Sequence, residues 1–322
     1  MMKNERKLFA DFLSSEECEN VCFACHVSPD GDTVASAFAL AALLRARGRR
    51  VFVSLPEAFP KNLSFLFEEF DNTPFEPDVV VAVDVSTPER LGNFAYADRV
   101  RAVIDHHLGN SFDVSVKFVD SSASATGLLV LELYDELGVV PSDFVARALY
   151  TAVSTDTGRF CYSNADARTF SAAARLVALT EKGNFADLNR RLFVEKDAAR
   201  LRVEGYVLSH VETEESLGLV YFALTQKLRK KFRLAPDADL GSLVDVLRTF
   251  AGFECAILAK ETEERGVFKL SVRTEGSLSA NEFCARFGGG GHARAAGATV
   301  CAGSEKKLKK LLVCALSEER GK

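Results

Sequence analysis

Acidic and imidazole side chains follow three apolar segments in the first third of the chain. Seven residues are placed in this way: His26, Asp30 and Asp32 after residues 21–25, Asp84 after residues 79–83, and Asp105, His106 and His107 after residues 100–104. An eighth, Asp156, lies in the small polar stretch 154–158, which we expect to form a loop after a helix. Carboxylates that converge without matching Lys or Arg repel each other, so their charge requires a cation.

The chemistry of this donor set indicates a particular kind of metal site. Mixed Asp and His ligands suit Mn, Fe or Zn better than Ca or Mg alone. Four Asp and two His are enough ligands for two metals that share a bridging carboxylate. Metal pairs roughly 3.5–4 Å apart lower the pKa of a water between them and neutralise charge that develops on phosphate. The residues therefore predict phosphate chemistry at a pair of metals.

A structural interpretation of each residue taken singly is also available. A lone Asp after a strand most often forms a turn or caps a helix, and a lone His is usually a packed polar group. The co-occurrence argues against that interpretation here. Four of the five histidines, His26, His106, His107 and His292, lie in such motifs, and only His210 does not.

One cysteine pattern suggests a different chemistry. Cys22, Cys25 and His26 together match the string that attaches haem covalently. Residues 21–25 resemble a buried strand, however, which would point the two thiols to opposite faces. Structural thiols are therefore the better interpretation.

The elements that must position these residues follow an α/β pattern. Valine-rich runs predict strands at residues 21–25, 51–54, 79–83 and 100–104. Between the first two lies an Ala- and Leu-rich helix, residues 33–47, which Gly48 closes. Continuous apolar strands separated by helices indicate a parallel sheet, whose carboxyl edge is where ligands bind.

The remainder of the chain predicts further helices and a second α/β unit. Helices are expected at residues 125–137, from Ser142 or Asp143 to about 153, within 165–208, at 241–250 and after Gly303, with strands at 218–224, 254–260 and 267–272. We therefore predict a first domain over residues 1–185, a helical connector over 186–212 and a smaller second domain over 213–322.

Length and composition support this division. A chain of 322 residues favours two domains, and 48% hydrophobic with 26% charged residues is typical of a globular protein. The net charge of −5 argues against a binder of long duplexes. We find neither a secretory signal nor an apolar run long enough to span a membrane, and therefore expect a cytoplasmic protein with reduced thiols.

The motifs resemble those of a known family. His26-x-x-Pro-Asp30-x-Asp32, Asp84, Asp105-His106-His107 and the Asp156 motif resemble the four motifs of the DHH phosphoesterases. The run from Gly288 through His292 to Gly297 resembles the signature of the C-terminal domain that accompanies one DHH subfamily. Five motifs in the same order cover about residues 22–300.

The resemblance implies roles for the site residues. It assigns His26, Asp30 and Asp84 to one metal, and Asp32, Asp84, His106 and Asp156 to the other, with Asp84 bridging. Manganese is the expected ion. The resemblance also implies that His107 faces the substrate phosphate, either stabilising the transition state or protonating the leaving oxygen, and that Asp105 orients its neighbours.

For the second domain, the resemblance implies contacts with the substrate. Arg273 occupies the position of the family's phosphate-gripping arginine. Gly289, Gly290, Gly291 and His292 would clamp a nucleotide or phosphate, followed by a small helix that starts at Ala295. Glycines permit close backbone approach and can expose amide donors to an anion.

The implied function is that of a manganese-dependent enzyme with its active site in the cleft between the two domains. It would hydrolyse short single-stranded RNA and linear dinucleotides such as pApA to mononucleotides, and pAp to AMP, as a homodimer without a membrane partner. A stand-alone cyclic-dinucleotide phosphodiesterase is not separable by sequence. A non-catalytic nucleotide-binding regulator is disfavoured, because we would expect it to have lost one or more ligands.

Overall fold

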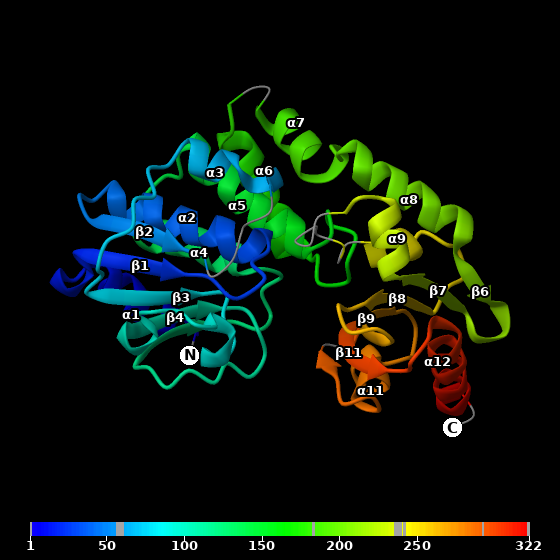
Figure 1. Cartoon of the computed structure of the whole chain (residues 1–322). Helices are drawn as coiled ribbons and strands as arrows, with labels where there is room; N and C mark the ends of the chain where they lie inside the picture. The colour runs from blue at the N-terminus through cyan, green and yellow to red at the C-terminus, as the bar shows by residue number, and fades with distance from the viewer. Residues whose placement is uncertain are drawn as a thin grey trace. The chain divides into compact units, whose positions relative to one another are not determined.

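Five parallel strands form the sheet of the first part of the chain (Figure 1). They are β1 Asn20–Ala24, β2 Arg50–Ser54, β3 Val79–Val83, β4 Val100–Asp105 and β5 Val116–Val119, in the order β2-β1-β3-β4-β5. The four predicted strands are confirmed to within a residue, and β5 was not predicted. This computed structural model describes residues 2–55, 61–181, 184–234, 240, 243–291 and 293–320.

Helices cover one face of this sheet. They are α1 Met2–Ser14, α2 Gly31–Arg45, α4 Thr126–Glu136, α5 Asp143–Asp156 and α6 Ala167–Leu179, with the shorter α3 Phe65–Glu68, α7 Asn184–Asn189 and a π-helical turn Arg190–Val194. Val21 and Phe23 share the core with these helices, whereas Cys22 packs on the opposite face with Val85 and Phe112 from irregular segments. Both faces are buried, which explains why the strands are apolar throughout.

The two thiols of the haem-like string are buried on different sides of the sheet. Cys22 belongs to the core cluster on one face, and Cys25 belongs to the cluster under the helices. Both are free thiols. The prediction of structural cysteines is confirmed.

The second part of the chain is built on a mixed sheet. Its strands are β6 Glu212–Glu214, β7 Leu219–Leu224, β8 Cys255–Glu261, β9 Val267–Thr274, β10 Gly290–Gly291 and β11 Ala295–Cys301, in the order β10-β11-β9-β8-β7-β6. Among the strand pairs of the described residues, β7 and β8 are parallel and the other neighbours are antiparallel. Its helices are α8 Ala198–His210, α9 Gln226–Lys231, α10 Leu243–Leu247, α11 Ala280–Ala285 and α12 Glu305–Arg320.

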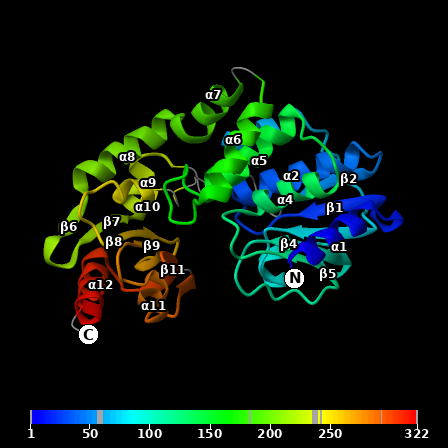
Figure 2. The same cartoon turned by 180° about the vertical axis from the view of Figure 1, so that it is seen from behind.

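Helices lie on both sides of this second sheet (Figure 2), and a hydrophobic core is packed on each face. Helices α8 and α10 pack with Val220 and Leu258 on one face, and α11 and α12 pack with Tyr221 and Ile257 on the other. The chain divides into two compact units, Met1–Glu195 and Lys196–Lys322. The α/β fold class is confirmed for both units, and the division with a separate connector stays a prediction.

The remaining elements are short 3₁₀ turns: Glu16–Cys18, Lys61–Leu63, Pro88–Leu91, Ala97–Arg99 and Glu215–Leu217. One predicted element is wrong, because Ala295 begins strand β11 instead of a helix. In the part of the chain that the structure describes, the helices are too short or too polar to cross a membrane.

Candidate metal centre and active site

The three neighbouring strands β1, β3 and β4 end beside one another, and each delivers a predicted site residue. His26, Asp84 and His106 follow these strands, and the carboxyl ends of parallel strands meet at one edge of the sheet. His26 Nε2 lies 3.6 Å from Asp84 Oδ2, and His106 Nε2 lies 3.6 Å from Asp84 Oδ1. The topology therefore brings the predicted residues together.

Asp84 lies at the centre of this arrangement. Its side chain is buried, and its two carboxylate oxygens face different histidines: Oδ2 faces His26, while Oδ1 faces His106 and His107. Its backbone has φ of +60°, a left-handed conformation that a non-glycine residue rarely adopts. Such strain costs about 1–3 kcal/mol and persists only where the surrounding structure holds it, as the sheet edge does here.

The first potential ligand group consists of His26, Asp30 and Asp84, whose ligand atoms lie within 4.8 Å of one another. The Nδ1 of His26 is 2.8 Å from the carbonyl oxygen of Val27, which accepts its hydrogen, so Nε2 faces the two carboxylates. Asp30 caps α2, since its Oδ1 accepts the N–H groups of Asp32 and Thr33. Its other oxygen, Oδ2, lies 3.7 Å from His26 Nε2.

The second group consists of Asp32, His106 and Asp156. His106 Nδ1 is 3.1 Å from the carbonyl oxygen of Ala123, which leaves Nε2 facing Asp156 at 3.4 Å and Asp32 at 3.8 Å. Asp84 is also 3.6 Å from this nitrogen. The Asp84 carboxylate therefore lies between the ligand group of His26 and the ligand group of His106.

Asp156 is the last residue of helix α5, so its predicted loop position is wrong. The Thr151 and Thr155 hydroxyls donate back to helix carbonyls, and the helical hydrogen bonds continue to the Thr157 N–H, which donates to the carbonyl of Val153. The end of α5 approaches the start of α2 at Gly31, where a Cβ would lie 2.4 Å from Thr155 Oγ1. Asn164 fixes the Asp156 backbone, because its Nδ2 donates to the Asp156 carbonyl at 3.2 Å.

The electrostatics of the cluster call for a cation. Burial raises the pKa of Asp32 well above its usual value, and the charges of Asp84 and Asp156 raise it further. Burial and Asp84 also raise the pKa of Asp156, to about 7. Among the described residues, the ion-pair partners of these carboxylates are histidines, not Lys or Arg. Carboxylate oxygens and imidazole nitrogens without a cationic side chain fit divalent metals.

His107 is held by the residue two positions before it. Asp105 is fully buried, and its Oδ1 accepts hydrogen bonds from His107 Nδ1 at 2.8 Å and from the His107 backbone N–H. This hydrogen bond raises the pKa of His107 above its ordinary value. Asn110 donates to the other Asp105 oxygen at 2.7 Å. The network orients the imidazole, as metal-site histidines require.

The structure also reveals site residues that the sequence did not single out. Thr126 donates its N–H to Asp32 at 2.6 Å and its hydroxyl to Asp84 Oδ1 at 2.9 Å. Gly127 N–H and the Ser36 hydroxyl also donate to Asp32. The available signal was weak: α4 begins after Ala125, which offers no capping side chain, so its first N–H groups need an external acceptor.

In the second unit, Arg273 lies on β9 and is half-buried. It is paired with Ala256 of β8, which packs in the core beneath α8 and α10. Because paired residues on adjacent strands share a face of the sheet, Arg273 projects from the face that these helices cover. An open depression of about 380 Å³, lined by Lys269, Gly288 and Gly289 among others, lies beside β9 and β11.

The glycine run allows close packing of the chain against itself. A Cβ on Gly289 would lie 2.1 Å from the carbonyl oxygen of Gly297, and one on Gly291 would lie 2.6 Å from that of Ala295. The N–H groups of Gly289 and Gly291 already donate to Cys284 and to the Asn281 side chain. These two amides are thus not open to an anion. His292 lies outside the described residues.

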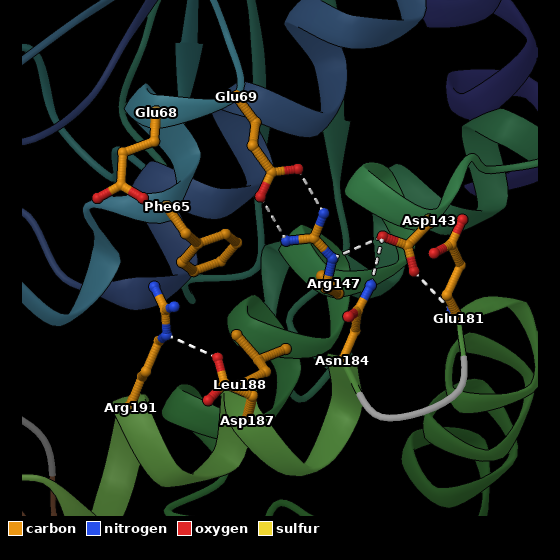
Figure 3. A pocket seen from close by; sticks show the side chains of 10 residues that line it. All are labelled: Phe65, Glu68, Glu69, Asp143, Arg147, Glu181, Asn184, Asp187, Leu188 and Arg191. Carbon is orange, nitrogen blue, oxygen red and sulfur yellow. Dashed lines mark hydrogen bonds and ion pairs between the residues drawn. The ribbon is translucent and has the colours of Figure 1, made fainter.

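A separate cavity of about 420 Å³ in the first unit contains none of the predicted site residues (Figure 3). It lies between α3, α5 and α7, and Arg147 is one of the residues that line it. Arg147 donates two hydrogen bonds to Glu69 and one to Asp143, so these carboxylates neutralise its charge. The cavity is a polar space between helices, without the mixed donor set of the metal centre.

Comparison with known proteins agrees with this site. Residues 20–153 match the model of the DHH family N-terminal domain, and residues 225–318 match that of the DHHA1 domain. The chain is 33% identical over 300 residues to the bifunctional oligoribonuclease and PAP phosphatase NrnA of Thermus thermophilus, covering 91% of this chain and 88% of that protein. It is 27% identical to the Bacillus subtilis protein of the same name, covering 85% and 87%.

Solved structures share the fold. An exopolyphosphatase-related protein from Bacteroides fragilis superimposes with a TM-score of 0.88 at 25% identity, covering 98% of this chain and 96% of that one. RecJ from Thermus thermophilus, solved in complex with Mn²⁺, matches with a TM-score of 0.52 at 15% identity, covering 98% of this chain and 54% of that one. The second likeness concerns the fold alone.

A parallel sheet that gathers carboxylates and imidazoles at one edge, followed by a smaller mixed-sheet unit, defines a hydrolase of the phosphoesterase class. The chain belongs to the DHH family.

Proposed function

We propose that this chain hydrolyses short oligoribonucleotides and linear dinucleotides such as pApA to mononucleotides, and pAp to AMP. The main structural support for this proposal is that five potential ligands converge around Asp84: His26, Asp30, Asp32, His106 and Asp156. The names of the Thermus and Bacillus relatives, which cover most of this chain, support the choice of substrate.

Two divalent cations, with Mn²⁺ as the expected ion, fit the two groups of donors. His26, Asp30 and Asp84 would hold one, and Asp32, Asp84, His106 and Asp156 would hold the other. When bound, such a pair activates water and neutralises charge on the phosphate. The opposite orientations of the two Asp84 oxygens support its role as the shared ligand.

His107 is the proposed acid beside these groups. Its Nδ1 hydrogen bond to Asp105 fixes the ring, so Nε2 is the atom that would donate a hydrogen bond or a proton to the substrate phosphate. Asp105 would act through His107, because its own oxygens are occupied by His107 and Asn110. We therefore assign Asp105 a positioning role.

The second unit would bind the part of the substrate that is not cut. Arg273 would contact a phosphate, because a guanidinium can make two parallel hydrogen bonds to phosphate oxygens. Gly289, Gly290, Gly291 and His292 would lie against the nucleotide, with the glycines permitting close approach. We also retain the prediction of a cytoplasmic homodimer, which sedimentation velocity and cell fractionation would test.

A substrate panel tests the proposal. Purified protein with Mn²⁺ should hydrolyse pApA, two- to five-residue RNA and pAp, and leave cyclic-di-AMP and pyrophosphate largely intact. The variant D84N should lose more than about a hundredfold in activity, because it removes the shared ligand. The exposed Asp98 of the same unit provides the matched control D98N, which should stay active. Failure of the wild type on both pApA and pAp would contradict the substrate assignment.

A further inference from the structure

Helix α9 and the turn after it carry an unusual density of positive charge. Five cationic residues occur within seven positions, Lys227, Arg229, Lys230, Lys231 and Arg233, in a chain whose net charge is −5. All except Arg229 are exposed. Within the described ranges, no carboxylate forms an ion pair with the three lysines. Like charges so close together repel one another, and a polyanion would relieve that repulsion.

A stacked pair of rings lies next to this helix. The imidazole of His210 is parallel to the Tyr206 ring, with centroids 3.8 Å apart and an interplanar angle of 13°. His210 Nδ1 lies 2.9 Å from Ser209 Oγ and 3.0 Å from the Tyr206 carbonyl oxygen, and these contacts hold the ring in place. His210 is exposed, and it is the histidine that lies outside the metal-site motifs.

Contacts join the rings to α9 in one surface. Lys231 Nζ lies 4.4 Å from the centroid of the Tyr206 ring, and the Phe232 ring packs against Tyr206 at 5.2 Å. Both views show α9 beside the second half of α8 (Figures 1 and 2). Leu228 of α9 packs on the core that lies over the same sheet face as Arg273. The predicted phosphate contact and this surface therefore share one side of the second unit.

We propose that α9 and the Tyr206–His210 stack form a binding surface for single-stranded nucleic acid. Lys227, Lys230 and Lys231 contact phosphates, and the outer face of His210 stacks on a base. Single-strand binding combines these two features, a cationic track and stacking rings. A duplex hides its base faces, and an anionic membrane offers phosphates but no base to stack, so the immobilised ring favours a single strand.

This inference rests on the proposed function for the choice of ligand. An enzyme that cuts short RNA would use the surface to hold nucleotides beyond those at the metal centre. The contribution of this surface should therefore depend on the length of the oligonucleotide. The surface should matter for an oligonucleotide of several residues and not for pAp, which has one base and no further strand.

Direct binding without cleavage tests the surface. The probe is a fluorescein-labelled eight-residue oligoadenylate RNA, and anisotropy is measured in EDTA so that no divalent ion supports hydrolysis. The variant K227E/K230E/K231E should bind at least about tenfold more weakly than wild type at 50 mM salt. Each phosphate contact to a single strand contributes roughly 0.7 to the slope of log affinity against log salt concentration. Because the variant removes three such contacts, its slope should be smaller by about 2.

The matched control changes the same charge on α12 of the same unit. Lys306, Lys307 and Lys310 are exposed there, so K306E/K307E/K310E alters net charge equally and should bind within twofold of wild type. The ring is tested separately. H210A should weaken binding about fivefold, and H210F should restore it, because a flat ring can still stack on Tyr206.

The outcomes separate this inference from the proposed function. The proposed surface would be contradicted if the α9 and α12 variants lost RNA affinity equally. It would also be contradicted if the wild-type protein bound duplex RNA or phosphatidylserine vesicles more tightly than the single strand. Hydrolysis of pAp by the α9 variant with Mn²⁺ should stay within twofold of wild type. If the wild type binds RNA through α9 but hydrolyses nothing, only the proposed function fails.

Discussion

At the scale of the residue, the candidate centre depends on how single carboxylates are oriented. Asp84 is held in a left-handed backbone conformation with its two oxygens facing different histidines. Thr126 fixes one of these oxygens through its hydroxyl and at the same time binds Asp32 through its N–H. One residue thus orients a carboxylate of each predicted ligand group, although it holds no metal in the proposed scheme.

Replacing Thr126 by Val should remove its contact with Asp84 and keep its contact with Asp32. The change keeps the shape and the N–H group but removes the hydroxyl that donates to Asp84 at 2.9 Å. Partners behind metal ligands typically contribute 10- to 100-fold to metal affinity or activity, so we expect a loss in about that range. Titration calorimetry with Mn²⁺ would measure the affinity, and the rate of pAp hydrolysis would measure activity.

The matched variant is T126S, which keeps the hydroxyl and should retain most of both properties. Circular dichroism would establish that the two variants are folded alike. Equal behaviour of T126V and T126S would show that the hydroxyl does not support Asp84.

At the scale of the element, helix and strand ends bring the site together. Asp30 caps α2 with one oxygen and faces His26 with the other, and Asp32 accepts the first N–H groups of α4. Carboxylates at helix N-termini are stabilised by the unpaired N–H groups there. The same residues thus complete the helices and line the site.

The glycine run shows an element-scale requirement that can be tested by mutation. G289A should destabilise the second unit by about 1–3 kcal/mol, because its Cβ would lie 2.1 Å from the Gly297 carbonyl oxygen. G290A is the control, since the nearest atom to its Cβ is Asn281 Oδ1 at 3.6 Å, and a change of less than about 0.5 kcal/mol is expected. Urea denaturation would measure both, and equal effects would argue against the close-packing role.

At the scale of the whole molecule, each unit has its own core, and the first also carries the cluster of buried acids. Its folded state should therefore be stabilised by a cation that neutralises the acids. A ligand present at 100 times its Kd stabilises the folded state by about 2.7 kcal/mol. For a unit of this size we expect a rise in Tm of roughly 5–10 °C on adding Mn²⁺ to chelated protein.

Scanning fluorimetry with and without EDTA would measure this shift. The variant D84N should show a much smaller rise, whereas D98N should respond like wild type. An unchanged Tm in wild type would contradict metal binding at this centre.

The chelated protein should also lose stability as the pH rises. Burial lowers the pKa values of His26 and His106, but nearby carboxylates outweigh it and raise them, to about 10 for His26 and about 9 for His106. A histidine whose pKa is higher when folded stabilises the protein fully below its unfolded value of 6.5, and that contribution disappears as the pH passes the folded value. Tm in EDTA should thus fall between about pH 6.5 and 10.

Mn²⁺ should reduce this fall, because metal ligands must be deprotonated. The variant H210Q changes an exposed histidine away from the centre and should follow the wild-type curve. A Tm in EDTA that rises or stays level over this range would refute the expected charge state of the cluster.

Strands β1 to β4 and the site residues that follow them could be predicted from the amino-acid sequence. Short valine-rich runs separated by helical segments are typical of buried parallel strands, and the carboxyl ends of such strands share one edge. The convergence of His26, Asp84 and His106 could therefore be predicted. Local patterns also predicted the structural role of Cys22 and Cys25, because strand alternation is a property of neighbouring residues.

The residues that support this site became visible in the folded chain. Thr126 meets Asp32 across 94 positions and Asp84 across 42, and Asn164 meets Ser124 across 40. No periodicity encodes such contacts, since they depend on how helices pack on the sheet. The extension of α5 to Asp156 and the strand at Ala295 were missed for the same reason. Tertiary contacts outweigh the weak local preferences of small residues.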